Sequence, residues 1–203
     1  MTAAALRTFR LHAASRRVPV ALAMIAVIGI ALRVTLIGHW DAYGALQLPL
    51  VFEAACAAVI AVTTGSPLGE PERVTGPWLP PLRLITTLAL TAVAAAVLIA
   101  AGLGATLAGG SGEVLRNLAG LTGLGLLCAV LLGGGLAWIA PLGYLLASVY
   151  ALYTLWHGPA LTTAWLWPAR PPGDLGGAVC ATLAFAAGLT LCTIRGAHDR
   201  SEE

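Results

Sequence analysis

The chain has no lysine, and only 10% of its 203 residues are charged. A phosphate-binding loop of the GxxxxGK[ST] type requires a lysine, so this chain cannot hold ATP in that way. Any ATP that drives the protein must therefore be bound by another polypeptide. The net charge of +2 is also too small to suggest a nucleic-acid-binding protein.

Motifs of catalysis and metal binding are missing as well. There is no HExxH sequence, and Ser148, the only serine within a predicted span, has no histidine beside it. The four cysteines all lie in apolar runs without CxxC or Cys/His spacing: Cys56, Cys128, Cys180 and Cys192. In such runs cysteine behaves as a small hydrophobic residue. The sequence predicts no catalytic residue, no metal or cofactor site and no enzymatic activity.

The chain is rich in apolar residues. Hydrophobic residues make up 59% of it, and its mean hydropathy is +0.88. This composition indicates a polytopic membrane protein, and because lipid offers backbone groups no hydrogen-bond partner, the apolar runs must be helices. We expect an all-α fold, a single transmembrane domain over residues 1–203 with six spans. These lie at about 18–37, 45–64, 84–107, 115–133, 137–156 and 175–194.

A run of three glycines and the positions of the tryptophans mark the ends of these spans. Gly133, Gly134 and Gly135 are predicted to form a tight turn between the fourth and fifth spans, although a single long broken element is an alternative. All six tryptophans fall at or near span ends, where they serve as interfacial anchors: Trp40, Trp78, Trp138, Trp156, Trp165 and Trp167.

The arginines indicate the orientation of the chain. Eight of them fall on one side of the six-span arrangement: Arg7, Arg10, Arg16, Arg17, Arg73, Arg83, Arg195 and Arg200. Only Arg116 and Arg170 fall near span ends on the other side. Basic residues accumulate in cytoplasmic loops. We therefore expect a multi-pass protein of the cell's inner (plasma) membrane with both termini and the 65–83 loop in the cytoplasm.

Two segments outside the spans have a membrane-associated interpretation. Residues 2–17, "TAAALRTFRLHAASRR", suit an amphipathic helix in the cytoplasmic interface, with a disordered basic leader as the alternative. Residues 157–174, "HGPALTTAWLWPARPPGD", suit a re-entrant element in the outer leaflet, with a plain surface loop as the alternative.

Two charged residues lie inside predicted spans, Arg33 in the first and Glu53 in the second. They would lie about 6 Å and about 12 Å below the outer ends of their helices, so an ion pair between them is possible. Intramembrane charges often contact substrate or carry protons. The structural alternative is that Arg33 reaches the outer headgroups and that Glu53 is satisfied by a neighbouring helix or by Arg33 itself.

The most polar internal stretch is "GEPERVTGPWLPPLR", residues 69–83. Its prolines forbid a long helix but permit one short helical turn. Glu70, Glu72 and Arg73 then form a compact charged element, which Trp78 and Arg83 hold close to the membrane. An element of fixed shape suits docking to a partner, since it loses little entropy on binding. The simpler alternative is a solvated loop that only reverses the chain.

This layout resembles the permease subunits of compact six-span ATP-binding-cassette exporters, in particular small actinobacterial ones. The resemblance covers the amphipathic segment at 2–17, the loop at 66–83 with "EPER" at 70–73, and the segment at 157–174. It implies that an ATPase subunit docks on the 66–83 loop and that a second permease subunit, identical or related, completes the transporter. The apolar lining favours export of a lipophilic or amphipathic compound.

Two other classes of membrane protein remain as alternatives. The substrate-binding subunit of a vitamin-type importer also has about six spans, but its alanine-x-x-x-alanine docking pattern is missing from residues 21–32. The other alternative is a non-transporting anchor or assembly subunit of a multisubunit complex, in which the 66–83 loop would dock a partner that is not an ATPase.

Overall fold

The computed structural model describes residues 17–37, 44–65, 79–104, 110–153 and 163–197, and helices are the only regular elements among them. The α-helices are α2 (Val18–Ile37), α3 (Gly44–Val62), α5 (Leu79–Ala101), α6 (Gly110–Leu132), α7 (Ile139–Tyr153) and α8 (Leu175–Arg195). Two short 3-10 helices complete the set, η2 (Gly134–Leu136) and η4 (Trp167–Ala169). The all-α prediction is confirmed for this part of the chain.

Among the described residues, five segments are long and apolar enough to cross a membrane. They are Val18–Ile37, Leu79–Ala101, Gly110–Leu132, Gly134–Leu152 and Leu175–Arg195. The remaining helix, α3, has 19 residues and contributes a shorter apolar stretch, Leu48–Val62. The structure is therefore that of a membrane-embedded helical protein, as the composition predicts.

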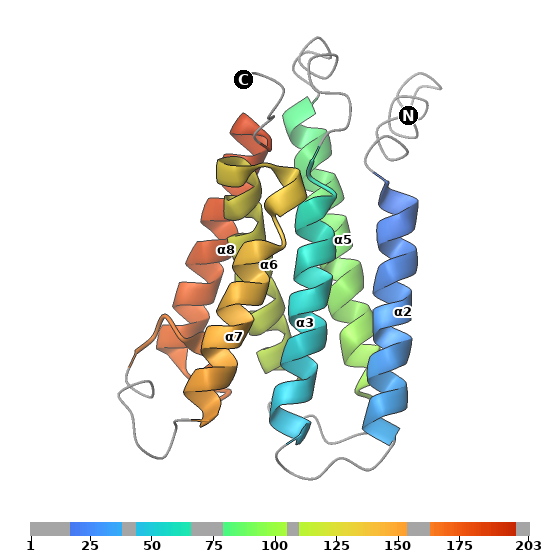
Figure 1. The fold of residues 1–203 in the computed structure, drawn as a ribbon, viewed down its shortest axis with the longest axis vertical. Coiled ribbons are helices and arrows are strands. Elements are labelled where there is room, and N and C mark those ends of the chain that lie inside the picture. The colour runs from blue at the N-terminus through green and yellow to red at the C-terminus, as the bar shows by residue number, and fades with distance from the viewer. Residues whose placement is uncertain (1–16, 38–43, 66–78, 105–109, 154–162, 198–203) are drawn as a thin grey trace.

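The helices run alternately up and down in one bundle (Figure 1). We call the end at which α2 begins and α8 ends the upper end, as it is drawn in Figure 1. Helices α5 and α7 also begin there, and α3 and α6 also end there. The upper ends of α5 and α8 touch, since a Cβ atom built on Gly196 would lie 2.7 Å from Nη1 of Arg83.

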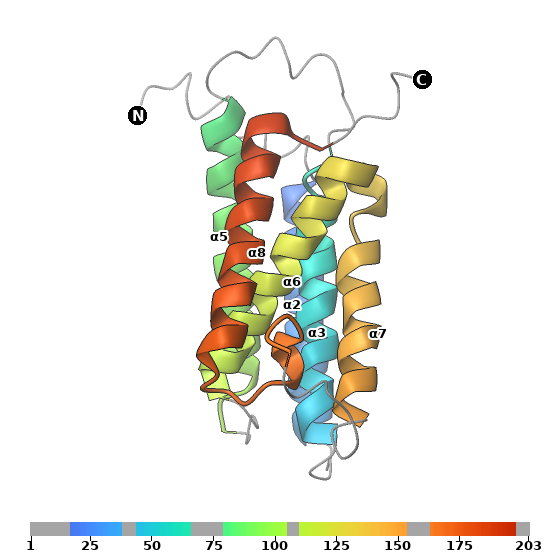
Figure 2. The ribbon, with the colours of Figure 1, turned by 90° about the vertical axis from the view of Figure 1, so that its left-hand side faces the viewer.

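Helix α6 is the central element of the bundle and packs against α8, α3, α7 and α5 (Figure 2). In the most apolar part of α6, 67% of the residues are buried, against 22 to 33% in the corresponding parts of the other four candidate spans. Its closest approach is to α8. A Cβ atom built on Gly123 would lie 2.4 Å from the carbonyl carbon of Ala184, and one on Gly188 would lie 2.4 Å from the carbonyl oxygen of Gly123. Glycine is required here because the two backbones touch.

Two helices begin earlier in the sequence than the predicted spans. Helix α5 begins at Leu79, ahead of residue 84, and includes Pro80 and Pro81. Proline is accepted in the first turn because the N–H groups there have no intrahelical partner. Helix α6 begins at Gly110, ahead of residue 115. It therefore includes the "GSGE" sequence, residues 110–113, which precedes the predicted span.

The connection between α6 and α7 is a tight turn at the upper end. Gly133 has a φ of 92°, a conformation that favours glycine, and the short helix η2 follows at once. This turn rests directly on the end of α3. A Cβ atom built on Gly134 would lie 2.4 Å from the Cα atom of Gly65.

Several predicted features lie outside the described residues. These are the interfacial helix at 2–17 apart from residue 17, the core of the 65–83 loop with Glu70, Glu72, Arg73 and Trp78, and residues 154–162. For these segments the sequence predictions stay predictions.

Candidate functional site

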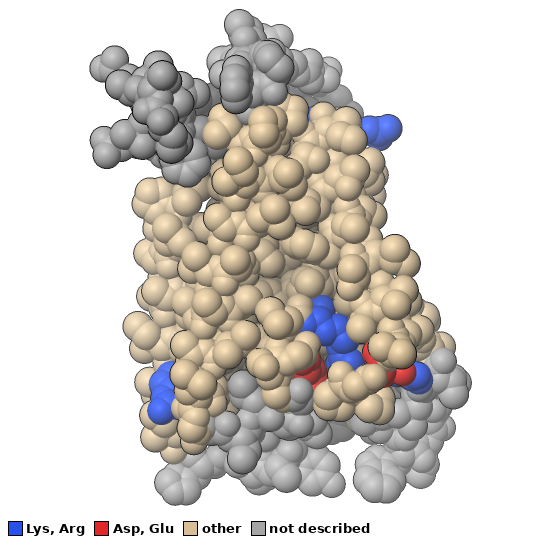
Figure 3. Space-filling view, turned by 180° about the vertical axis from the view of Figure 1, so that it is seen from behind, with Lys and Arg blue, Asp and Glu red and all other residues tan. Residues whose placement is uncertain are grey.

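The acidic side chains of the described residues lie in the lower half or the middle of the bundle. Glu113 and Asp174 stand at the lower ends of α6 and α8, and Glu53 lies halfway along α3. Figure 3 shows acidic and basic atoms gathered in the lower part of the face seen from behind, among uncharged residues. This part of the molecule therefore contains the candidate functional site.

Glu53 is the most deeply buried charged residue described, with 1% of its surface exposed. The side chain of Asn117 hydrogen-bonds its carboxyl group, and Glu113 and Arg116 lie near enough to interact with it electrostatically. The Oε2 atom of Glu53 is buried without a hydrogen-bond partner. The carboxyl group thus has less polar support than its burial requires.

Asn117 links the other polar side chains of the site. Its Oδ1 atom accepts a hydrogen bond from Nε of Arg116 at 3.3 Å. Its side chain also hydrogen-bonds Glu113. Because Oδ1 is used by Arg116, the two amide hydrogens are left for the carboxyl groups of Glu53 and Glu113. We call Glu53, Glu113, Arg116 and Asn117 the buried polar cluster.

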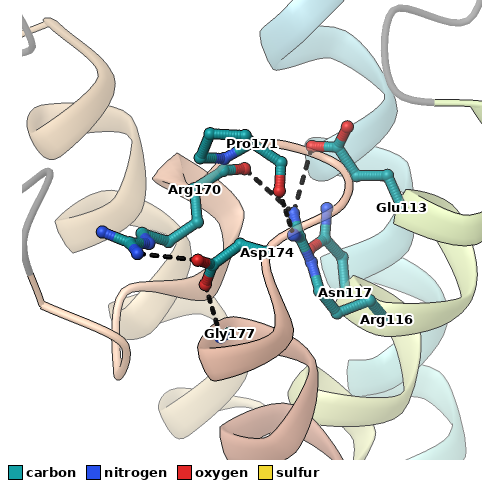
Figure 4. Close-up of polar contacts among 7 residues, drawn as sticks. All are labelled: Glu113, Arg116, Asn117, Arg170, Pro171, Asp174 and Gly177. Atoms are coloured by element: carbon teal, nitrogen blue, oxygen red, sulfur yellow. Dashed lines mark hydrogen bonds and ion pairs between the residues drawn. The ribbon is translucent and has the colours of Figure 1, made fainter.

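Arg116 ties this cluster to a distant part of the chain (Figure 4). Its Nη1 atom donates to the carbonyl oxygen of Pro171 at 2.9 Å, and its Nη2 atom donates to that of Arg170 at 3.3 Å. Nη2 also lies 3.5 Å from Oε1 of Glu113, and only 5% of the Arg116 side chain is exposed. The guanidinium group therefore holds the segment before α8 against the lower end of α6.

That segment, residues 163–174, folds back against the helices instead of extending away from them (Figure 2). Its 3-10 helix η4 packs against α6, α7 and α8. Trp167 is buried and stacks on Tyr144 of α7, and the Tyr144 hydroxyl donates to the carbonyl oxygen of Trp165. We call residues 163–174 the inserted segment. It is the described part of the predicted re-entrant element at 157–174.

Asp174 ends the inserted segment and begins α8. Its Oδ2 atom accepts from the N–H of Gly177 at 2.6 Å, which caps the helix. Its Oδ1 atom lies 2.7 Å from Nη2 of Arg170. The Arg170 hydrogen bond, helped by the Gly177 N–H, lowers the pKa of Asp174 to about 2. Asp174 and Arg170 are thus a local ion pair that closes the segment on itself.

The charges of the buried polar cluster do not balance. It holds two carboxyl groups and one guanidinium group, and the guanidinium contacts are with Glu113, Asn117 and two backbone carbonyls. Among the described residues, no cation is in contact with Glu53. Within the same residues no group of three histidine, cysteine or acidic side chains could hold a metal ion. The arrangement is therefore a buried carboxyl group beside a guanidinium group whose contacts are made elsewhere.

The two intramembrane charges named from the sequence are not brought together. Glu53 is buried against α6, whereas Arg33 is exposed and donates from Nη1 to the carbonyl oxygens of Ala101, at 3.2 Å, and Leu103. Arg33 therefore contacts the C-terminal end of α5, where helix carbonyls lack intrahelical partners and attract cations. The ion pair between Arg33 and Glu53 is absent because each side chain has its own nearer partner.

Sequence reasoning missed three members of the cluster: Glu113, Arg116 and Asn117. One signal was available, because positions i, i+3 and i+4 lie on one face of a helix, and "EVLRN" places these three residues at that spacing. Glu113 precedes the predicted span at about 115–133, and Arg116 enters the prediction only as an indicator of orientation.

Comparison with protein-family models, with curated proteins and with solved structures finds no match for this chain.

Proposed function

We propose that this chain is the membrane-spanning permease subunit of an ATP-binding-cassette exporter. In this proposal α3 also crosses the membrane, as the second of six spans along the chain. Its 19 residues extend about 28 Å at 1.5 Å per residue, which is close to the thickness of the hydrocarbon core. Six spans agree with the observation that α2 begins and α8 ends at one end of the bundle.

The observation that carries the proposal is the position of the segment between α3 and α5. Helix α3 ends and α5 begins at the upper end, together with the start of α2 and the end of α8. The polar "EPER" sequence at 70–73 belongs to this connection. A six-span permease needs its ATPase-docking loop between spans two and three, on the same side as both termini, and the helix ends meet this requirement.

The arginines support a cytoplasmic upper end. Arg17, Arg83 and Arg195 adjoin helix ends there, and Arg7, Arg10, Arg16, Arg73 and Arg200 precede or follow those helix ends in the sequence. At the lower end Arg116 and Arg170 each face an acidic residue, Glu113 and Asp174. Basic residues favour the cytoplasmic side. The protein would then lie in the plasma membrane with both termini inside.

The transport cycle would use two permease subunits, identical or related, and two ATPase subunits. The chain has no lysine for a phosphate-binding loop, so hydrolysis belongs to the partner. Glu70, Glu72, Arg73 and Trp78 would form the docking element. Coupling requires that the ATPase bind the inward-open and outward-open states with different affinity, because only differential binding shifts a conformational equilibrium.

A lipophilic or amphipathic compound is the cargo class that the bundle favours. The main core cluster consists of buried aliphatic, alanine and cysteine side chains, among them Ile25, Ala54, Leu98 and Leu121. Such surfaces offer few partners for the hydroxyl groups of a sugar.

The test is purification of the tagged chain from its own membranes. We expect a protein with a GxxxxGK[ST] motif to copurify and the complex to hydrolyse ATP. Replacing Glu72→Ala together with Arg73→Ala should weaken both association and hydrolysis, since the docking charges are removed. The matched control is Asp199→Ala with Arg200→Ala, which removes the same charges from another segment on the same side.

Two results would overturn the proposal. One is intact association and hydrolysis in the Glu72→Ala, Arg73→Ala variant. The other is stable copurification of a partner without an ATPase motif, which would favour the anchor or assembly subunit.

A further inference from the structure

Glu53 is a carboxyl group without the surroundings that an ionised carboxylate requires. It lies midway along α3, is 1% exposed, and leaves Oε2 without a partner. An isolated ionised carboxylate is very costly to bury, and a buried group of this kind takes up a proton instead. One hydrogen bond from Asn117 is too little to offset that cost.

Among the described residues, no charged group compensates for the buried carboxyl group. From α6, Glu113 and Arg116 face Glu53, and Arg116 is already bound to Glu113 and to the carbonyl groups of Arg170 and Pro171. From α3 itself the neighbour is the thiol of Cys56, which carries no positive charge. The charged residue of α2, Arg33, is bound to the end of α5 instead. On α7 the titratable group Tyr144 interacts with Arg116.

Polar side chains extend from this carboxyl group to the lower end. Asn117, 3% exposed, hydrogen-bonds both Glu53 and Glu113. The Glu113 side chain is 17% exposed. The cluster therefore becomes more exposed step by step from Glu53 to the lower surface. The inserted segment covers it and is held by Arg116 through contacts to two backbone carbonyls.

We propose that Glu53 is an exchangeable proton-binding site. The proton sits on the Glu53 carboxyl group while α3, α6 and the inserted segment are packed together, and it exchanges with solution at the lower end. The ligand is a proton and not a larger cation, because Glu53 is 1% exposed and the described residues around it do not supply the set of oxygen ligands that a metal ion requires. This inference does not depend on the ATPase partner proposed above.

Infrared spectroscopy of the full chain in lipid tests the proposal directly. A protonated carboxyl group has a carbonyl stretch that is separate from the bands of an ionised carboxylate. We expect this band at neutral pH in the wild type and its loss in Glu53→Gln, with the band retained in the matched variant Glu113→Gln. Transfer to D2O should shift the band, and raising the pH should decrease it, because both require exchange with solvent.

A second variant covers the case in which Glu53→Gln does not fold. Asn117→Ala removes the hydrogen bond to the carboxyl group, so the band should shift in frequency without being lost. A band that disappears in Glu113→Gln, or does not move in Asn117→Ala, would assign the proton to another residue and overturn the proposal.

Three further results would contradict it. They are the absence of any band that depends on Glu53 at neutral pH, a band that neither shifts in D2O nor responds to pH, and a band that Na⁺ removes at constant pH and ionic strength. The last result would identify a sodium site in place of a proton site.

Discussion

The indole ring of Trp167 stacks on the phenol ring of Tyr144, with ring centroids 4.5 Å apart and planes inclined by 27°. Trp167 is only 4% exposed, and the stack joins the inserted segment to α7. The indole ring also lies against Gly120 of α6, where a Cβ atom would be 2.5 Å from the ring. The segment is thus held between two helices by one aromatic side chain.

Gly120→Ala should displace Trp167 and loosen the inserted segment. An added methyl group in a packed site costs about 1–3 kcal/mol. The measurement is the free energy of unfolding in detergent. Gly143→Ala on α7 is the matched control, since its Cβ meets nothing within 4 Å and alanine is the better helix former. Equal stability of the two variants would contradict the packing described here.

Gly123→Ala should separate α6 from α8. The new Cβ would meet backbone atoms of Ala184 and Phe185 at 2.4 to 2.5 Å, and backbone cannot rotate away as a side chain can. We expect a loss of about 1–3 kcal/mol in the free energy of unfolding. Gly188→Ala acts at the same contact, so the two losses should not add. Gly112→Ala, which meets no atom within 4 Å, is the control on the same helix.

Asp174 should contribute a pH-dependent part of the stability. Its pKa falls from the ordinary 3.8 to about 2 in the folded protein because Arg170 and the Gly177 N–H favour the ionised form. A lowered pKa gives stability that is complete above the unfolded value and is lost as the pH falls through the folded value. The difference in unfolding free energy between wild type and Asp174→Asn should therefore be constant near neutral pH and shrink from about pH 4 to about pH 2.

The control for this prediction is Asp174→Ala. Asparagine caps a helix about as well as aspartate, so Asp174→Asn isolates the charge, whereas alanine also removes the cap. Asp174→Ala should thus be less stable than Asp174→Asn even at low pH. A difference between wild type and Asp174→Asn that grows on acidification would contradict the assignment.

Glu53 should be energetically coupled to Asn117 and not to Arg33. A double-mutant cycle of Glu53→Ala and Asn117→Ala should give an interaction of about 0.5–3 kcal/mol, as for residues in contact. The matched cycle of Glu53→Ala and Arg33→Gln should be additive within about 0.5 kcal/mol, since the two residues share no partner. Unfolding free energies measured in one detergent check both cycles. Coupling to Arg33 as strong as that to Asn117 would contradict the structure.

Composition alone predicts the fold class, because lipid excludes every alternative to helices for apolar runs of this length. The sequence also identifies Glu53 as unusual, because it is a charged residue within an apolar run. In the structure Glu53 is buried. Helix starts are less predictable. Pro80, Pro81 and the "GSGE" sequence are typical of loops, yet they lie in the first turns of α5 and α6. Proline is tolerated there because the first residues of a helix have no intrahelical acceptor for an N–H group.

The remainder of the site depends on contacts that no local pattern encodes. Arg116 binds carbonyl groups 54 and 55 residues away, and these are backbone atoms that exist at every position. Trp167 is predicted to be an interfacial anchor from its place near a span end, but it is buried and stacked. Only the return of the inserted segment to the bundle brings these groups together.

The contact between Gly65 and Gly134 has a mechanical consequence. No side chain separates these two backbones, so we expect the residues just after α3 and the turn before α7 to move together. If an ATPase displaces the chain just after Gly65, as proposed, the displacement should reach the η2 turn and the adjoining end of α6, the helix that carries the polar partners of Glu53.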